Sequence, residues 1–312
     1  MKRYMKGIEL AREFYEEFGR PMIEGDFAEY VDRIAVGIVG RGSECFGFDD
    51  DISTDHDFEP GFCIWLTDED EREFGFKLFR AYSALPKEYK GYKLQERSNS
   101  ITSGRGVMTI SEFYRNYTGK ADGPENLSDW LYIPSQYLAE ATNGEVFYDP
   151  LGEFSRIRDY IKNGMPEDVR RKKIASCALL MAQSGQYNYA RCLSHGEGGA
   201  ARLALSEFVQ KSIEMVFLLN RAHMPYYKWS FKAMRKLDIL DEKALVLEQI
   251  LNSPNEASKE IILEIEAFCS EVISELKGQG LTELDDDYLE RHAYFINGTI
   301  KDNRLRNSEI II

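Results

Sequence analysis

The segment VGIVGRGSECFGFDDDISTDHDFEPGFCIWL, residues 36–66, decides how this chain is expected to fold and what chemistry it suggests. A short apolar run ends in the turn at residues 40–43, and after eleven further residues come Asp55 and Asp57. Side chains two residues apart on an extended chain leave the same face, so these carboxylates lie close together. Two adjacent anions repel each other unless a cation lies between them. Hard oxygen ligands favour Mg²⁺, which is usually shared with the phosphates of a substrate.

The turn itself carries groups that suit phosphate. Gly42 allows the backbone to approach a ligand closely, and Ser43 offers both an amide and a hydroxyl. Arg41 is able to pair with a phosphate in bidentate fashion. Phosphoryl transfer asks a protein mainly for positioning and charge stabilisation, and the turn and a metal held by Asp55 and Asp57 would supply both.

Other common sites do not fit the sequence. No Gly-Lys-Ser/Thr follows the turn at the spacing of a P-loop, and glycines 40, 42 and 47 do not form the Rossmann pattern GxGxxG. The four histidines lack zinc spacing, and the five cysteines are scattered without a CxxC pair. Zinc chemistry is not expected, and the cysteines are expected to be free thiols.

Composition limits the range of partners. The chain has 312 residues, 43% of them hydrophobic, and a formal net charge of 39 minus 53, or -14. This acidity argues against binding a long nucleic acid or an anionic membrane, which are held mainly by Lys and Arg. No apolar run approaches the roughly 18 residues of a membrane span, and no signal segment is evident at the N-terminus. We expect a cytoplasmic protein that does not bind membranes.

The first half of the chain mixes helix and strand patterns. Helical spacing of apolar residues is seen over residues 5–18, near residues 27–34 and again over residues 74–82. Strand patterns cover residues 34–39, 56–66 with a bend at Pro60-Gly61, and 107–110. These patterns predict an α/β domain over residues 1–153.

The second half is almost entirely helical in pattern. Apolar residues recur with a period near 3.6 over residues 167–185, 199–221, 242–252 and 257–277. These patterns predict a helical bundle over residues 154–312 and an α+β protein as a whole.

The motif and the domain plan together resemble a known superfamily. Residues 39–43, followed by Asp55-His56-Asp57-Phe58 and the strand to Leu66, resemble the nucleotidyltransferase fold typified by DNA polymerase beta. A catalytic α/β domain followed by a helical domain resembles the kanamycin and lincosamide nucleotidyltransferase branch. Residues 218–229 look like part of the helical domain in a largely uncharacterised bacterial group of such proteins. The resemblance implies a mixed sheet with flanking helices, followed by a C-terminal helical domain.

The resemblance also assigns roles to residues. It implies that Gly42 and Ser43 hold the triphosphate of ATP or another nucleoside triphosphate, and that Asp55 and Asp57 bind two Mg²⁺ ions. It further implies a homodimer as one way to complete the site. Family members place a third carboxylate on a later strand, but the matching residues 106–110 contain no acid. The remaining candidates for the third carboxylate are Glu96, Glu112 or an acid in the helical domain.

The helical domain contributes a second set of candidates. Tyr226 offers a flat apolar face for a base or sugar, and Lys228 is able to neutralise a phosphate. Tyr226 is equally typical of a core or interface aromatic. Glu207 is expected to be a partly buried general base, because Ala204 and Phe208 are its neighbours. Further candidates for gripping a substrate, which are also typical of structural polar residues, are Gln186, Arg191, Arg202, Asn220 and Arg221.

These observations favour an enzyme, an Mg²⁺-dependent nucleotidyltransferase. It would move a nucleoside monophosphate, AMP from ATP, onto a hydroxyl of a small-molecule acceptor and release pyrophosphate. One alternative keeps this chemistry but transfers AMP onto a protein. Another is a catalytically weak nucleotide-binding or interaction module, suggested by the absence of the third acid.

Overall fold

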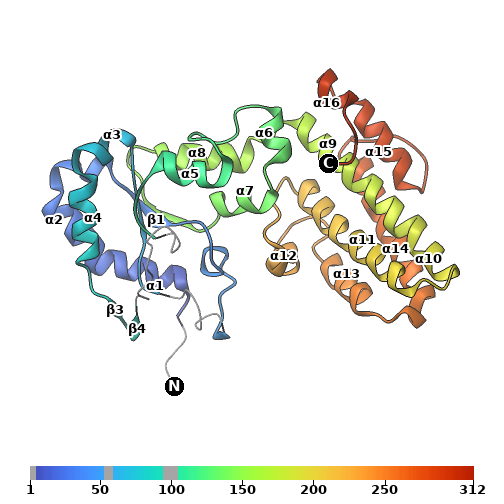
Figure 1. Cartoon of the computed structure of the whole chain (residues 1–312), viewed down its shortest axis with the longest axis horizontal. Coiled ribbons are helices and arrows are strands. Elements are labelled where there is room, and N and C mark those ends of the chain that lie inside the picture. Colours follow the sequence, from blue (N-terminus) through green and yellow to red (C-terminus); the bar gives the residue numbers. More distant parts are fainter. Residues whose placement is uncertain (1–4, 53–58, 94–104) are drawn as a thin grey trace. The chain divides into compact units, whose positions relative to one another are not determined.

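The computed structural model describes residues 5–52, 59–93 and 105–312 and has an α+β fold (Figure 1). The chain divides into two compact units. The first unit contains Met1–Asp129 and Gln136–Gly164, and the second contains Trp130–Ser135 and Met165–Ile312.

The first unit carries all the strands of the described residues. Its first half contains α1 (Gly7–Phe14), the π-helix η1 (Tyr15–Gly19), α2 (Arg20–Asp26), the 3-10 helix η2 (Ala28–Arg33), β1 (Ala35–Ile38), the 3-10 helix η3 (Glu44–Phe46) and β2 (Cys63–Leu66). Then come α3 (Asp68–Asp70), the π-helix η5 (Glu71–Gly75), α4 (Phe76–Ser83), β3 (Glu88–Tyr89), β4 (Tyr92–Lys93), β5 (Gly106–Thr109) and α5 (Ile110–Thr118). The remaining elements are α6 (Leu127–Tyr132), which runs into the second unit, α7 (Ser135–Thr142), β6 (Glu145–Tyr148) and α8 (Glu153–Asn163).

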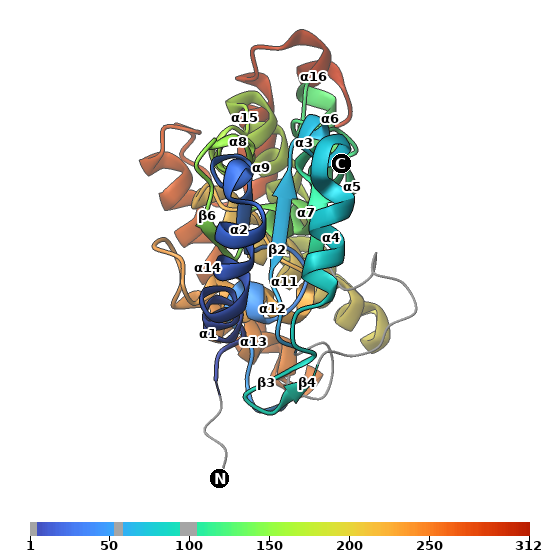
Figure 2. The same cartoon turned by 90° about the vertical axis from the view of Figure 1, so that its left-hand side faces the viewer.

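A four-stranded mixed sheet is the centre of this unit. The strand order is β5-β2-β1-β6. β1 pairs antiparallel with both β2 and β6, and β2 pairs parallel with β5. Figure 2 views this unit with β2 between α2 and α4. The sheet is therefore mixed, as the sequence predicted.

Alternate residues of β2 pack on opposite faces of the sheet. Ile64 and Leu66 join a core with residues of α1, α2 and α4. Trp65 points the other way, where its ring stacks on Phe154 of α8 with 3.8 Å between centroids and meets Phe113 of α5 edge-on. Helices thus cover both faces, which explains why the strand reads as a continuous apolar run.

One predicted strand begins later in the structure than expected, and one strand of the four-stranded sheet was not predicted. β2 begins only at Cys63, because Pro60 has no amide to donate and Gly61 has a φ of 151° that breaks the extended run. The fourth strand, β6, was not predicted, since Glu145–Tyr148 is short and half-buried and shows no apolar alternation. Close approach of β6 to β1 requires a glycine. A Cβ on Gly37 would lie 2.4 Å from the Glu145 carbonyl oxygen.

The division between the units also falls later than the expected boundary at residue 153. α8 belongs to the first unit because its apolar face is buried there. Phe154 stacks on Trp65, and its carbonyl accepts a hydrogen bond of 2.8 Å from the buried Tyr114 hydroxyl.

The second unit is helical, as predicted. Its elements after α6 are α9 (Glu167–Met181), the π-helix η7 (Ala182–Tyr189), α10 (Ala190–Ser194), α11 (Gly198–Leu219), α12 (Tyr227–Met234), α13 (Lys243–Asn252), the 3-10 helix η8 (Asn255–Ala257), α14 (Ser258–Gly278), α15 (Leu289–Gly298) and α16 (Asn303–Asn307). One continuous core joins α9, α11, α13, α14 and α15. All five cysteines are free thiols, as expected. Within the ranges that the structure describes, no helix is both long and apolar enough to cross a membrane.

Candidate functional site

The sheet brings the turn that follows β1 and the chain that enters β2 to the same edge. β1 and β2 are antiparallel with Gly37 opposite Cys63, so the turn that leaves β1 lies beside the chain that enters β2. β5 is parallel to β2 and therefore also begins at this edge, and β6 begins there because Glu145 pairs with Ile38. We call this edge, where β1 ends and β2, β5 and β6 begin, the motif edge.

The glycine turn after β1 is held by residues that precede β6. The Asn143 side chain forms two hydrogen bonds with Gly40, accepting from its amide at 2.8 Å and donating to its carbonyl at 2.7 Å. The Gly144 amide donates to the Cys45 carbonyl at 2.8 Å. The Ser43 carbonyl accepts from the Phe48 amide at 2.8 Å, which closes the turn. The backbone of residues 40–48 is therefore fixed rather than free to collapse onto a ligand.

A buried ion pair lies directly beneath the turn. Arg105, the residue before β5, approaches Glu44 at 3.0 Å, and the two side chains are 7% and 9% exposed. Gly42 makes room for this pair, since its φ is 114° and a Cβ there would lie 2.4 Å from both carboxylate oxygens of Glu44. The glycine is thus required by packing as well as by the backbone conformation.

Arg105 also reaches the chain that enters β2. Its guanidinium donates to the carbonyl oxygen of Glu59, which is two residues beyond Asp57 in the sequence. Burial acts to lower the pKa of Arg105, but Glu44 together with Cys45, Glu59 and Tyr82 outweighs it, and the pKa is raised. This permanently charged side chain connects the turn to the chain that enters β2.

Arg41 lies at the exposed surface of the turn. Its side chain is 71% exposed, and its Nε is 3.7 Å from the carboxylate of Glu140 on α7. The Tyr117 hydroxyl lies over Gly40, 2.8 Å from where a Cβ would stand. Burial, reinforced by Glu140, raises the pKa of Tyr117, so this hydroxyl is neutral and able to donate a hydrogen bond. Arg41, Gly42 and Ser43 therefore lie together, with a guanidinium accessible to an anion.

Asp55 and Asp57 lie outside the described residues, as do His56 and Glu96. Their role at the motif edge stays a prediction. Within residues 5–52, 59–93 and 105–312, no three carboxylate, histidine or cysteine side chains cluster in a way that would hold a metal ion.

The structure separates Glu112 from the motif edge. It lies in the first turn of α5, after β5 has crossed the sheet, and is therefore at the opposite edge. Glu44 and Glu59 lie at the motif edge instead, and both are buried. Neither was predicted as a carboxylate of the metal site. The signal for Glu44 was its position next to Ser43, whereas nothing in the sequence indicated that a distant arginine would bury it.

In the second unit, Glu207 is exposed and does not have the partial burial expected of it. Successive helical residues are about 100° apart around the axis, so Glu207 does not share the face of the fully buried Phe208. Tyr226 and Tyr227 are exposed, with their ring centroids 4.3 Å apart. The Lys228 ammonium lies 4.4 Å from the Trp229 ring centroid. These aromatic side chains at the start of α12 form an accessible surface.

Other polar candidates in the second unit are structural. The Gln186 side chain donates to Glu266 at 2.8 Å and to the Asp287 carbonyl at 3.0 Å. Arg202 donates to the Ser253 carbonyl at 2.5 Å and to the Leu251 carbonyl at 3.0 Å, where α13 ends. The Asn220 amide bonds the Val216 and Ile239 carbonyls. Arg202 satisfies carbonyls at the end of α13. Gln186 and Asn220 also bond carbonyls in the connections before α15 and α13, so these three side chains support the fold.

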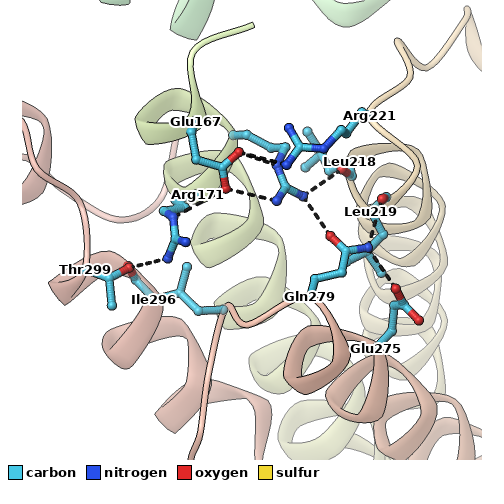
Figure 3. Close-up of polar contacts among 10 residues, drawn as sticks. Glu167, Arg171, Leu218, Leu219, Arg221, Glu275, Gln279, Ile296 and Thr299 are labelled. Carbon is cyan, nitrogen blue, oxygen red and sulfur yellow. Dashed lines mark hydrogen bonds and ion pairs between the residues drawn. The ribbon is translucent and has the colours of Figure 1, made fainter.

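Arg221 belongs to a network at one end of the second unit (Figure 3). Glu167 accepts hydrogen bonds from Arg170 and forms ion pairs with Arg171 at 3.4 Å and Arg221 at 3.1 Å. Arg170 also donates to the Leu218 carbonyl and to Gln279. This network connects the start of α9 to the ends of α11 and α14.

Comparisons with known proteins give limited matches. Residues 130–230 match the family described as "Domain of unknown function (DUF4037)". A solved structure of a nucleotidyltransferase-like protein from Exiguobacterium sibiricum 255-15 is similar with a TM-score of 0.37 and 14% sequence identity, over 87% of this chain and 81% of that one. No curated protein matches this chain.

Proposed function

We propose that this protein is an Mg²⁺-dependent nucleotidyltransferase that moves a nucleoside monophosphate, AMP from ATP, onto a hydroxyl group of a small molecule. One observation carries the proposal. Arg105 bonds both Glu44 in the glycine turn and the carbonyl of Glu59, so a phosphate-type turn and the chain next to an Asp-x-Asp pair meet at one edge of the sheet.

The groups at the motif edge suit a triphosphate. In this proposal Ser43 and the backbone at Gly42 hold phosphate oxygens, and Arg41, which is exposed, pairs with a terminal phosphate. Tyr226 and Lys228, exposed at the start of α12, stay proposed nucleotide-binding residues on the ground of their residue types. The protein as a whole carries a net charge of -14, so a local cation is needed for an anionic substrate to bind.

The donor set fits Mg²⁺. Asp55, Asp57 and the Ser43 hydroxyl offer only hard oxygen atoms, and no histidine or thiolate is required. When bound, the metal would neutralise charge that develops on the phosphates. In the proposed reaction the acceptor oxygen bonds to the α-phosphorus, the bond from that phosphorus to the bridging oxygen breaks, and pyrophosphate leaves with the bonding electrons. The acceptor proton passes to a carboxylate, for which Glu207, accessible on α11, is the first residue to test.

The experiment is a measurement of nucleotide transfer by mass spectrometry, with pyrophosphate release followed in parallel. The purified protein is incubated with Mg²⁺, each of the four nucleoside triphosphates and a panel of hydroxylated small molecules. We expect ATP-dependent transfer that falls to background in Asp57→Asn. Asp51→Asn is the matched control, because it removes a carboxylate from the same loop but outside the alternating pair. Glu207→Gln should reduce transfer while leaving triphosphate binding intact.

Two further measurements separate the alternatives. Labelled ATP added with a cell lysate would label a protein band if the acceptor is a protein. Calorimetric binding of Mg²⁺-ATP with no pyrophosphate release would indicate a binding module. If the wild-type protein binds no triphosphate in the presence of Mg²⁺, the proposal is wrong. Sedimentation with and without nucleotide tests the proposed homodimer.

A further inference from the structure

The outer side of β5, along the length of the strand, offers backbone groups for pairing. β5 is the terminal strand in the order β5-β2-β1-β6, and among the described residues it pairs only with β2. The Gly106 amide donates to the Phe62 carbonyl at 3.1 Å, and in a parallel ladder alternate residues face the partner. The amide and carbonyl of Val107 therefore face away from β2. An outward-facing row of this kind is a template for another strand.

A groove runs along this outer side of β5. It has a volume of about 530 Å³ and is lined by Val107, Met108 and Thr109 of β5, by α4 and η5 on one side and by α5 on the other. Two large apolar side chains of α4 lie exposed in it, Phe76 at 73% and Phe79 at 43%. Exposed aromatic side chains beside a strand that pairs on one side only, among the residues described, indicate an interaction surface.

The charges around the groove select the kind of partner. Asp68, Glu71 and Glu112 line it and are exposed, whereas Arg115 is its basic residue. The rim thus carries three carboxylates against one guanidinium. A second copy of this chain, with a net charge of -14, would be repelled on approach. A partner segment rich in Lys or Arg would be attracted.

We propose that this groove binds an extended peptide segment of a basic partner protein, which adds a strand to β5 and alternates apolar with Lys or Arg side chains. The backbone of the segment pairs with Val107, and its apolar side chains cover Phe76 and Phe79 on the side of α4. Its cations lie on the side of α5 and face Glu112, while Glu71 adds to the negative charge of the rim. This interaction is separate from nucleotide transfer, because Arg41, Gly42, Ser43, Glu44, Glu59 and Arg105 are not among the residues that line the groove.

Fluorescence anisotropy with a labelled eight-residue peptide of alternating Lys and Val tests the proposal. We expect saturable binding to the full chain, at least about tenfold tighter than for the matched Glu-Val peptide. Val107→Pro removes an amide that faces away from β2, where proline is tolerated in an edge strand, and should weaken binding at least about tenfold. The double variant Glu71→Lys/Glu112→Lys should do the same.

Two controls separate strand addition from general attraction to an acidic protein. Glu24→Lys/Glu29→Lys makes the same change in charge on exposed residues of α2 and η2 and should leave binding unchanged. A Lys-Val peptide with N-methyl groups on alternate amides keeps its charge but cannot pair as a strand, so it should bind at least about tenfold more weakly. The methylated peptide needs no protein variant, so it tests strand addition even if Val107→Pro fails to fold. No binding at 1 mM, or equal binding of the methylated peptide, would overturn the proposal.

Discussion

Arg105 in the first unit and Arg170 in the second each place a guanidinium in a buried position beside a glutamate. Arg105 pairs with Glu44, 61 positions away, and both side chains are buried. Arg170 pairs with Glu167 three positions away on the same helix, and the Glu167 side chain is 40% exposed. The pair of Arg105 and Glu44 holds a turn whose neighbouring residues face water. In the other pair, Arg170 donates to the Leu218 carbonyl at the end of α11. The two buried arginines therefore differ in their surroundings, because exposed groups lie next to the first pair and helix-end backbone lies next to the second.

The largest difference between the two pairs should appear in stability. Arg105→Met leaves the Glu44 carboxylate buried without its cation, which should cost about 3–5 kcal/mol of unfolding free energy. Urea denaturation followed by circular dichroism measures this. The double variant Arg105→Met/Glu44→Met should recover most of the loss, because two apolar side chains replace the pair. If the double variant is as unstable as the single one, the pair is not the cause.

Gly42→Ala tests whether the turn and the ion pair depend on each other. The new methyl group would stand 2.4 Å from both Glu44 oxygens at a φ of 114°, so we expect a loss of about 3 kcal/mol. Gly47→Ala is the matched control. It lies in the same turn at a φ of 66° with no atom within 4 Å of the added Cβ, and should cost about 1–2 kcal/mol. Equal losses in the two variants would mean that contact with Glu44 has no effect.

The sequence was informative wherever the relevant residues are close together in the chain. The turn at residues 40–43 and the helices of the second unit follow local patterns of glycine and of apolar spacing. The contacts that complete the motif edge span long separations, 103 positions for Asn143 with Gly40 and 61 for Arg105 with Glu44. No local pattern records such contacts, and so β6 and the buried acids were missed.

The same reasoning explains the error at Glu207. Its sequence neighbour Phe208 is fully buried, but adjacent residues on a helix point in different directions. Gln186, Arg202 and Asn220 were candidates for gripping a substrate because of their residue types. Their actual partners include backbone carbonyls that are distant in the sequence, which only the tertiary structure identifies.

Arg170→Met should have a smaller effect than Arg105→Met. The variant removes donors from the Leu218 carbonyl and from Gln279, but Glu167 keeps Arg171 and Arg221 and remains in contact with water. We expect a loss of about 1.5–3 kcal/mol, the usual range for hydrogen bonds from a charged group. Urea denaturation of the two methionine variants side by side tests the comparison directly. A larger loss for Arg170→Met than for Arg105→Met would reverse it.

The smallest expected effect is the pH dependence of the Glu167 network. Burial raises the pKa of Glu167, but the hydrogen bond and charge of Arg170, with the charges of Arg221 and Arg171, outweigh it and lower the pKa below its ordinary 4.5. A carboxyl group with a lowered pKa in the folded state stabilises the fold above pH 4.5. That stabilisation is lost as the pH falls through the folded-state value.

Glu167→Gln should therefore be less stable than the wild type at pH 7, and the two unfolding midpoints should converge as the pH is lowered below 4.5. Glu264→Gln, at an exposed position on α14, should follow the wild type at every pH. The size of the gap is limited because water reaches Glu167 and screens its charge. A difference in unfolding midpoint that persists unchanged at low pH would mean that Glu167 acts through packing rather than through its charge. Glu167 and the buried Glu44 would then differ in geometry alone.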